Sequence, residues 1–460
     1  MRASGYLFFL SCFLIVLAFF SGGCAQVGIP TGGPKDTLAP KLIKATPAYG
    51  SRNVATNKFT LEFNEYIDVQ DLQKNMIISP LQKKTPTVII NPRSISFKFR
   101  DTLRPNTTYT VNFGDAVRDI NEGNVYKDLS YTFSTGNHLD SLTLSGTVIL
   151  AETGGADSTM IVMLYRNTAD SAVKKIKPDY IAKLNGDGSF NFTNLPPDPF
   201  KIYALKDVSG VKTYNSLSEL FAFTDSTVTP GSTGSIILFA YAQQPAADNQ
   251  KITPQKPVAE KKLRISTALQ GRQDLLTPLE MNFNSPLKFI DSNKIYLTDT
   301  FYNKIPSAHL SSDSTAKKLF LTTAWKPETP LILFVEKDAV KDSAGNMLSK
   351  TDTVRFFTKK NEDYGKLTLR FNGLDLKKKP VMQFLSGDVI MFSYPLSSPE
   401  WVNNMFPPAE YGIRILYDSN GDGKWTPGNY AKKLQPEISI TLRQKLSVRA
   451  DWDNEREIDL

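Results

Sequence analysis

Short runs in which apolar and polar residues alternate recur along the chain from position 38 onward. A period of two places successive side chains on opposite faces, which is the pattern of antiparallel strands with one buried face. Pro, Asn and Gly residues separate the runs and mark turns. Residues 69–75 alone predict a short helical turn. The sequence therefore predicts an all-β protein. The apolar positions of the first four runs are Phe59, Leu61 and Phe63; Ile95, Phe97 and Phe99; Tyr109, Val111 and Phe113; and Leu129, Tyr131 and Phe133.

One of these runs is preceded by a recognisable turn. Leu103, Pro105, Thr107 and Tyr109 occupy alternate positions. This order leads into a tyrosine corner, in which the tyrosine hydroxyl bonds back to the backbone and closes a crossover of a β-sandwich. The corresponding stretch around position 327 has Leu331 where the tyrosine would stand.

An internal repeat relates two segments of the chain. Residues 116–124 (AVRDINEGN) recur as residues 339–346 (AVKDSAGN), and each copy precedes a strand that ends in Phe and Thr. Upstream, both copies contain a Phe-Asn pair, at positions 63–64 and 283–284. The repeat resembles the bacterial Ig-like domain of the S-layer (SbsA) type, over about residues 38–136 and 263–359. The resemblance implies a β-sandwich in each segment.

Two other segments form a second pair. Residues 188–197 (GSFNFTNLPP) run into a strand that contains Tyr203. This arrangement is similar to the carboxypeptidase regulatory-like, or prealbumin-like, module, which the resemblance implies to be a small sandwich of seven strands. Residues 406–418 repeat its second half.

Segments without alternation divide the chain. Residues 24–37 are rich in Gly and Pro and predict a flexible tether, and residues 243–262 predict an interdomain linker. We predict an Ig-like first module (38–137), a prealbumin-like second module (138–242), a divergent Ig-like third module (263–360) and a divergent prealbumin-like fourth module (361–460). The linker is expected to separate two independently folding halves.

The N-terminus predicts export. Arg2 is followed by a largely apolar run of 15 residues (6–20), shorter than the roughly 20 residues that span a bilayer. Small residues and Cys24 come next, so residues 1–23 predict a cleaved signal peptide. The cysteine resembles that of the lipobox of bacterial lipoproteins, which implies a lipid on Cys24, although Ser21 replaces the usual aliphatic residue. The alternative is ordinary cleavage beside an incidental cysteine. Cys12 leaves with the signal, so the mature chain has no internal disulfide.

The net charge of the chain does not single out one class of partner. The chain has 54 Lys and Arg against 46 Asp and Glu, a formal net charge of +8. These residues are spread along the sequence without interleaved aromatics, so no nucleic-acid partner is predicted. A diffuse positive charge suits an anionic membrane surface or a polyanionic sugar, and equally suits simple solubility.

Candidate catalytic chemistry is scarce. The chain has two histidines, His138 and His309, in different predicted modules and without metal-ligand spacing to other His, Cys or carboxylates. The nucleophile motif G-x-S-x-G and the metalloprotease motif H-E-x-x-H do not occur. We therefore predict that the protein is not an enzyme and carries no cofactor.

One acidic loop is a candidate calcium site. Asp418, Asn420, Asp422 and Gly423 reproduce the opening of an EF-hand loop, in which oxygens at positions one, three and five wrap a hard cation. The twelfth position holds Asn429 in place of the bidentate glutamate. The alternative, a β-hairpin turn, is favoured because Asn-Gly and Asp-Gly are strong turn signals. Asp119 and Asp342 in the repeated motif are further candidates for cation sites, and structural Asx-type turns are the favoured interpretation there.

Sites of O-glycosylation are a third kind of candidate site. The O-glycosylation signal of Bacteroidota resembles Asp, then Ser or Thr, then a small or aliphatic residue or Thr. Asp-Ser and Asp-Thr pairs are also common turn formers, so the two interpretations coexist. The hydroxyl residues in matching triplets are Thr37, Thr102, Ser141, Ser158, Ser171, Ser226, Ser314, Ser343 and Thr353.

These observations favour a non-catalytic lipoprotein of the cell envelope, with a spacer or binding role at the outer membrane. The lipid anchor implies the membrane as a partner, and an envelope protein or polysaccharide is the candidate second partner. The residues after Cys24 lack the acidic run that resembles a surface-export signal, which favours the periplasmic face. The alternative is a carbohydrate-binding accessory or divergent glycan hydrolase of an outer-membrane uptake system. Three of the four tryptophans lie in the fourth module, which would favour that alternative if they are exposed.

Overall fold

The protein is built almost entirely from short strands. The computed structural model describes residues 35–232, 234–244, 262–269, 271–306 and 308–460. Strands form nearly all of the regular structure in these segments, which confirms the predicted all-β class. No helix of the described part is long and apolar enough to cross a membrane. The signal peptide, Cys24 and most of the tether lie outside the described residues.

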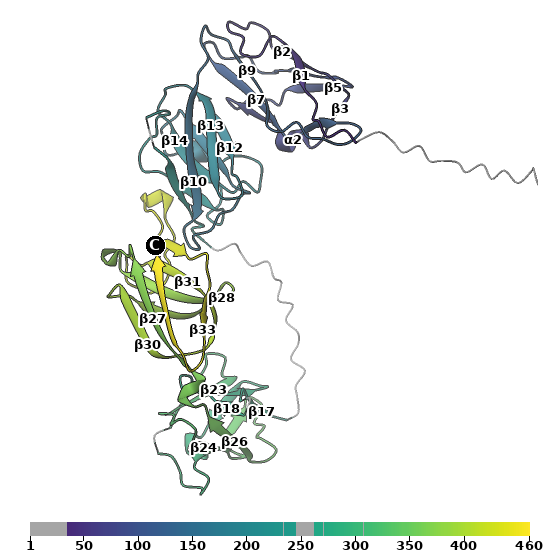
Figure 1. Ribbon diagram of the computed structural model, residues 1–460. Coiled ribbons are helices and arrows are strands. Elements are labelled where there is room, and N and C mark those ends of the chain that lie inside the picture. Colours follow the sequence, from purple (N-terminus) through teal and green to yellow (C-terminus); the bar gives the residue numbers. More distant parts are fainter. Residues whose placement is uncertain (1–34, 233, 245–261, 270, 307) are drawn as a thin grey trace, which may run out of the picture. The chain divides into compact units, whose positions relative to one another are not determined.

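The first module is a sandwich of small antiparallel sheets. One sheet has the order β1-β2-β6-β5, a second has the order β4-β7-β9, and β3 pairs with β8. Strands β7 and β9 lie side by side (Figure 1). The short helix α2 falls inside the predicted segment 69–75. The elements are β1 (Leu42–Thr46), β2 (Lys58–Phe63), β3 (Ile67–Val69), α2 (Leu72–Asn75), β4 (Ile77–Ser79), β5 (Thr87–Asn91), β6 (Ser94–Lys98), β7 (Thr108–Gly114), β8 (Val117–Asp119) and β9 (Leu129–Ser134).

All twelve alternating apolar positions predicted to be buried are buried in this module. Aromatic rings dominate its core; the Phe59 ring stacks on Phe97 with 5.2 Å between centroids. The predicted tyrosine corner is also present, because the Tyr109 hydroxyl accepts a hydrogen bond of 2.7 Å from the backbone N–H of Arg104. A buried ring and a satisfied hydroxyl therefore fix the same crossover.

The repeated motif residues have the same role in the first and third modules. The amide oxygen of Asn64 accepts from the N–H of Lys41, and that of Asn284 accepts from the N–H of Arg264. Each bond joins the start of a module to its second long strand. The repeat thus preserves side chains that hydrogen-bond to the backbone, which are the contacts that fix strand positions.

The threonine that ends the motif also has matched contacts. The Thr135 hydroxyl accepts from the N–H of Thr107 at 3.0 Å, and the Thr358 hydroxyl accepts from the N–H of Thr329 at 2.8 Å. In the third module Leu331 replaces the corner tyrosine, yet this threonine contact remains. The threonine hydrogen bond is therefore sufficient to maintain the turn without the tyrosine hydroxyl.

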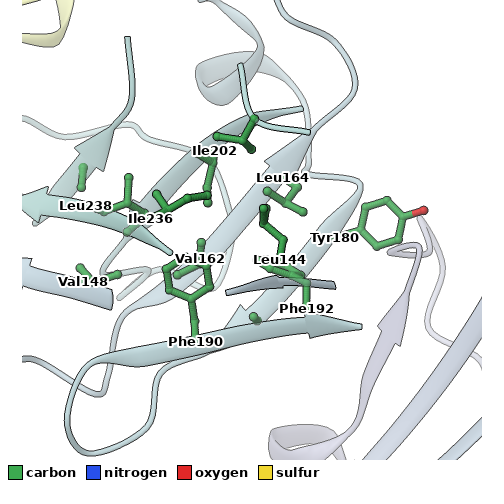
Figure 2. Close-up of a cluster of buried hydrophobic side chains, with 14 of the residues drawn as sticks. Leu144, Val148, Val162, Leu164, Tyr180, Phe190, Phe192, Ile202, Ile236 and Leu238 are labelled. Atoms are coloured by element: carbon green, nitrogen blue, oxygen red, sulfur yellow. The ribbon is translucent and has the colours of Figure 1, made fainter. Parts of the chain in front are cut away.

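The second module is a sandwich of two sheets, with strand orders β13-β10-β16 and β12-β11-β14-β15. Strand β16 pairs with β10 in parallel. Phe190 and Phe192 of β13 point across the core toward Val162 and Leu164 of β11 (Figure 2). The elements are β10 (Leu142–Leu150), β11 (Ile161–Tyr165), α3 (Ala172–Lys175), β12 (Tyr180–Lys183), β13 (Ser189–Leu195), β14 (Lys201–Leu205), β15 (Phe221–Phe223) and β16 (Ile236–Ala240).

The third module repeats the strand order of the first and adds the strand β18 to its second sheet. Its sheets have the orders β17-β19-β23-β22 and β18-β26-β24-β21, and β20 pairs with β25. The elements are β17 (Ile265–Thr267), β18 (Arg272–Gln273), β19 (Leu279–Phe283), β20 (Leu287–Ile290), η1 (Ser292–Lys294), β21 (Ile295–Thr298), β22 (His309–Ser312), β23 (Lys318–Thr322), β24 (Pro330–Val335), β25 (Val340–Asp342), β26 (Asp352–Thr358) and η2 (Asn361–Asp363).

The fourth module repeats the strand order of the second. Its sheets have the orders β30-β27-β34 and β29-β28-β31-β32, and β34 pairs with β27 in parallel, as β16 does with β10. The elements are β27 (Gly365–Asn372), η3 (Leu376–Lys378), β28 (Pro380–Ser386), β29 (Val389–Pro395), β30 (Glu400–Phe406), β31 (Ala409–Tyr417), η4 (Tyr430–Lys432), β32 (Ile438–Thr441), β33 (Leu446–Val448) and β34 (Asp453–Asp459).

The compact units of the structure do not divide at the linker. One unit ends at Asp140 and the other runs from Ser141 to Leu460, so the second and fourth modules belong to the same unit. Independent folding of the two halves on either side of residues 243–262 stays a prediction, which limited proteolysis within that linker tests. Residues 245–261 of that linker lie outside the described part of the chain.

The tyrosine corner gives a first prediction. Tyr109→Phe keeps the buried ring but removes the acceptor of the Arg104 N–H, so we expect a loss of about 1–3 kcal/mol in the free energy of unfolding of the first unit. Denaturant unfolding followed by tyrosine-sensitive spectroscopy measures this loss. Tyr49→Phe is the matched control, since Tyr49 is largely exposed and should change stability by less than about 0.5 kcal/mol. Equal effects of the two substitutions would contradict the prediction.

Candidate functional site: the Asp418 loop and an aromatic dock

The predicted calcium motif lies in the loop between β31 and η4. Asp418 is buried, with 2% of its surface exposed, while Asn420 and Asp422 are exposed. The Asp418 carboxylate accepts hydrogen bonds of 2.7 Å from the N–H groups of Gly421 and Gly423. The Asp422 N–H adds a longer bond of 3.3 Å. The carboxylate thus organises the loop around itself.

The other predicted ligands also have partners within the loop. The Asn420 side-chain oxygen accepts from the N–H of Asp422 at 2.8 Å, and its nitrogen donates to the Thr426 hydroxyl at 2.7 Å. In the described part of the chain, no three or more His, Cys, Asp or Glu residues are grouped so that they could hold a metal ion. The geometry therefore favours the turn interpretation, and calcium binding stays a prediction to be tested.

A second carboxylate, which sequence reasoning missed, holds the far side of the loop. Glu437 is buried and accepts from the Ser419 hydroxyl at 3.0 Å and from the Thr426 N–H at 3.0 Å. Its backbone carbonyl accepts from the indole N–H of Trp425 at 2.7 Å. Glu437 lies 18 residues after Ser419 and 11 after Thr426, so no local motif indicates its role.

The repeated Asp turns of the Ig-like modules use the same chemistry. The Asp119 carboxylate accepts from the N–H groups of Glu122, Gly123 and Asn124 at 2.6–2.9 Å. Burial alone would raise the pKa of Asp119, but these three donors outweigh it and hold the pKa below its usual value. The aspartate therefore stays charged and keeps the turn closed, as an Asx-type turn requires.

Asp342 forms the matching turn in the third module. Its carboxylate accepts from the Asn346 side chain at 3.0 Å and from the N–H groups of Ala344 and Asn346. The Asn346 side chain, followed by these N–H groups, keeps the pKa of Asp342 below its usual value against the opposing effect of burial. The structural turns predicted at both repeats are present.

The Asp418 loop carries Tyr430 into the second module. Tyr430 is 4% exposed, and its ring lies 5.1 Å, centroid to centroid, from each of Phe221 and Phe223. Its hydroxyl donates to the Asp170 carbonyl at 2.8 Å and lies 3.0 Å from the Tyr203 hydroxyl. Because the Tyr430 proton is used for the carbonyl, the Tyr203 hydroxyl is the donor to Tyr430. We call this arrangement the aromatic dock.

Tyrosine rings of the second module surround the inserted ring. Tyr165, Tyr203, Tyr214 and Tyr241 belong with Tyr430 to one buried cluster. Burial raises the pKa of Tyr430 and Tyr203 above the ordinary value, so both hydroxyls stay protonated and available for hydrogen bonding at neutral pH.

Polar contacts surround the dock. Lys433 forms an ion pair of 2.6 Å with Asp170, which lies at the surface and so contributes little by itself. The Gln435 side chain donates to the Phe223 carbonyl at 3.2 Å and to the Asp225 carboxylate at 3.0 Å. These bonds fix the orientation of the two modules around the apolar contact.

Backbone contacts extend the same interface. The N–H of Ser439 donates to the Ala151 carbonyl at 2.8 Å, and the Thr441 hydroxyl donates to the Thr153 carbonyl. Gly428 lies against the Tyr241 ring, and a Cβ there would come within 2.7 Å of the ring carbons. A side chain at position 428 would therefore force the modules apart.

The remaining candidate residues are widely distributed. All nine hydroxyl residues of the glycosylation triplets that the sequence singled out are exposed, and Thr353 is the one that lies within a strand. His138 and His309 are exposed as predicted. Trp325, Trp401 and Trp425 are partly buried, whereas Trp452 is 60% exposed. The tryptophans therefore do not gather on one exposed face.

The Asp418 loop gives a second prediction. Asp418→Ala removes the buried carboxylate that accepts from the N–H groups of Gly421 and Gly423, so we expect a loss of about 1–3 kcal/mol in the free energy of unfolding of the second unit. Asp422→Ala, at an exposed position, is the control and should cost much less. If the loop is a turn, added calcium leaves the melting temperature of the wild type unchanged. A rise with calcium that both substitutions abolish would instead establish the calcium site.

The aromatic dock gives a third prediction. A specific protease site inserted within residues 245–261 and then cut should leave the two fragments associated during gel filtration, because the dock joins them independently of the linker. Tyr430→Ala removes a buried aromatic ring and should cost about 3–5 kcal/mol of the docking free energy. The cut variant should then separate into its fragments. Tyr302→Ala, which changes an exposed ring of the third module, should leave the fragments together. Separation of the cut wild type would contradict the dock.

Comparison with known proteins supports the first module most directly. A family model described as a bacterial Ig-like domain matches residues 36–135, which is the segment in which the sequence resembles that family. No curated protein matches the chain. Since this match covers only the first module, it assigns that module and leaves the rest of the chain to its own structure.

Solved structures that are similar to parts of the chain share little sequence identity with it. A fragment of Escherichia coli alpha-2-macroglobulin is 15% identical over 40% of this chain and 72% of that one, with a TM-score of 0.21. The N-terminal part of the bacterial S-layer protein SbsC is 15% identical over 44% of each chain, with a TM-score of 0.17. The major pilin subunit BcpA of Bacillus cereus is 10% identical over 69% of this chain and 99% of that one, with a TM-score of 0.16.

Proposed function

We propose that the protein is a non-catalytic lipoprotein of the cell envelope that acts as a structural spacer or binding module. The observation that supports this most directly is the use of its buried carboxylates. Asp119, Asp342 and Asp418 each accept two or more backbone N–H groups of their own loops. These groups are engaged in shaping turns, where a catalytic acid or base needs a free position facing a substrate.

The proposal places a lipid on Cys24 and the sandwich modules beyond it. The lipid holds the chain at the outer membrane, with the periplasmic face favoured by the absence of an acidic run after Cys24. Cys24 has no second thiol to pair with in the mature chain, so a lipid accounts for this cysteine. Stability then comes from the hydrophobic cores and not from disulfides. An envelope protein or polysaccharide remains the proposed partner.

Exposure of the glycosylation triplets supports a second part of the proposal. All nine hydroxyls lie at the surface, and eight lie outside strands, where a glycan adds bulk without disturbing a core. Glycans at these turns would increase solvation and shield the backbone from proteases. The proposal therefore includes O-glycosylation of the mature protein.

The alternative, a carbohydrate-binding accessory or divergent glycan hydrolase, depends on exposed aromatic residues. Trp452 is the one tryptophan that is largely exposed, and the Arg449 guanidinium lies over its ring at 5.3 Å from the centroid. This exposed indole is already covered by an arginine, and other exposed rings such as Tyr49 and Phe301 lie in different modules, so they offer no common stacking surface for a glycan. The spacer function is therefore preferred.

The anchor gives the fourth prediction. Cells fed a fatty-acid probe should label the wild type, and Cys24→Ala should abolish the label and release the protein into the soluble periplasmic fraction. Intact-mass measurement of the wild type from its native host should exceed the mass of the lipidated polypeptide by the mass of the glycans.

Each outcome tests a separate part of the proposal. Equal labelling of the wild type and Cys24→Ala would remove the lipid anchor. A mass equal to that of the lipidated polypeptide would remove the glycans and leave the nine triplets as turns. Cys12→Ala is the matched control, because Cys12 lies within the predicted signal peptide and should not affect labelling.

A further inference from the structure

Strand β29 of the fourth module is an edge strand with an exposed apolar run. It pairs with β28 on one side and, in the described part of the chain, with no strand on the other. Val389, Ile390 and Met391 are consecutive and are 63%, 47% and 51% exposed. Three consecutive exposed apolar residues are unfavourable in a soluble protein unless a partner covers them. The open edge of β29 is therefore a candidate binding surface.

The other edge strands of the fourth module are protected in ways that β29 is not. Strand β34 contains five charged residues, which oppose pairing with another strand. Strand β32 lies against the second module, where the Ser439 N–H donates to the Ala151 carbonyl at 2.8 Å. Strand β30 begins with Glu400, which forms an ion pair of 3.2 Å with Arg370. Residues 389–395, by contrast, contain no charged side chain.

The second module shows the corresponding edge in a closed form. Its strand β12 occupies the position of β29, at the start of the order β12-β11-β14-β15. Strand β12 has four residues, and Tyr180, Ile181 and Ala182 are at most 8% exposed. The longer and exposed edge is thus a feature of the fourth module and not of the strand order that the two modules share.

Strand β29 is held in place without a partner. The rings of Phe392 and Tyr394 pack against the module core and lie 6.5 and 6.1 Å, centroid to centroid, from Phe384. Trp401 of β30 packs on Tyr394 at 5.0 Å. A bulge at Met391 shifts the pairing with β28 but leaves the Met391 side chain exposed. The edge is therefore preformed, which lowers the entropic cost of binding another strand.

We propose that β29 is a contact between two copies of this chain, which pair their β29 strands antiparallel across a two-fold axis. Pairing would satisfy backbone N–H and C=O groups of the open edge and bury the exposed apolar run. A second copy fits the charge of this surface, because an uncharged strand paired with itself places no like charges opposite each other. Asp388, which precedes the strand, would lie across from the Pro395 end of the other copy and away from its own counterpart. A two-fold contact of this kind closes on itself and forms a dimer.

The test measures self-association by sedimentation velocity with residues 24–460 carrying Cys24→Ser. This substitution removes the predicted lipid site and the one cysteine of these residues, so neither micelles nor disulfides can mimic a dimer. The result is therefore independent of the lipid anchor. A contact of one strand per copy is small for a protein interface, so we expect a reversible dimer to form between about 1 and about 200 µM protein. A monomer throughout this range overturns the proposal.

A charge substitution locates the contact. Met391→Lys places a charge on the open edge of each copy and should weaken dimerisation at least about tenfold. Val208→Lys, at a position that is 81% exposed in a loop of the second module, is the control and should leave dimerisation unchanged. Circular dichroism and the melting temperature verify that both variants fold. A dimer of Met391→Lys as stable as that of the parent chain overturns the proposal.

Hydrogen exchange shows whether the strands pair. Raising the protein concentration through the dimerisation range should slow exchange of the amides of residues 389–394 severalfold, because N–H groups of the open edge gain acceptors. The amides of β34, the charged edge, are the internal reference and should exchange at the same rate at every concentration. A dimer in which residues 389–394 exchange at the monomer rate forms through another surface and overturns the proposal.

Discussion

The insertion of Tyr430 is the interaction on which the larger unit of the chain depends. Its ring is buried among Phe221, Phe223 and Tyr203 of a module that begins almost three hundred residues earlier. If the Tyr430 ring were withdrawn from the second module, that module would expose part of its aromatic cluster to water. The fourth module would expose the Tyr430 ring itself. The second and fourth modules each have their own core, and the shared cluster joins them within the unit from Ser141 to Leu460.

A single ring can join two modules only if the loop that carries it is already ordered. Asp418 and Glu437 provide this order by accepting N–H and O–H groups from both sides of the loop. Conformational entropy is therefore lost when the fourth module folds, so less is lost when it docks. In this view the calcium-like spacing of Asp418, Asn420 and Asp422 reflects the needs of a tight turn. Carboxylates that cap N–H groups and carboxylates that ligate calcium require similar spacing, because both wrap a short loop around oxygen atoms.

Much of the fold was predictable because the signals are local. Alternation predicted the buried positions of the first module, and the spacing around Tyr109 predicted a bond from its hydroxyl to the backbone. The repeated Asp119 and Asp342 motifs predicted turns, since a short acidic side chain followed by Gly and Asn closes on its own backbone. These interactions join residues within a few positions of each other or within one alternating pattern, and a single sequence contains that information.

The dock was not predictable for the opposite reason. Tyr430 stands in a stretch with Pro, Gly, Asn and four Lys or Gln residues nearby, which has the composition of a solvated loop. Its partners Tyr203 and Phe221 alternate as ordinary core residues of another module. Nothing local marks a core residue that is shared between modules, because the pairing depends on two surfaces and not on one segment. The alternation of apolar and polar residues does stop at the predicted linker. Such a break does not show whether the modules on either side of it contact each other. Interdomain contacts of this kind decide where a chain divides, and they become visible only when the surfaces are placed together.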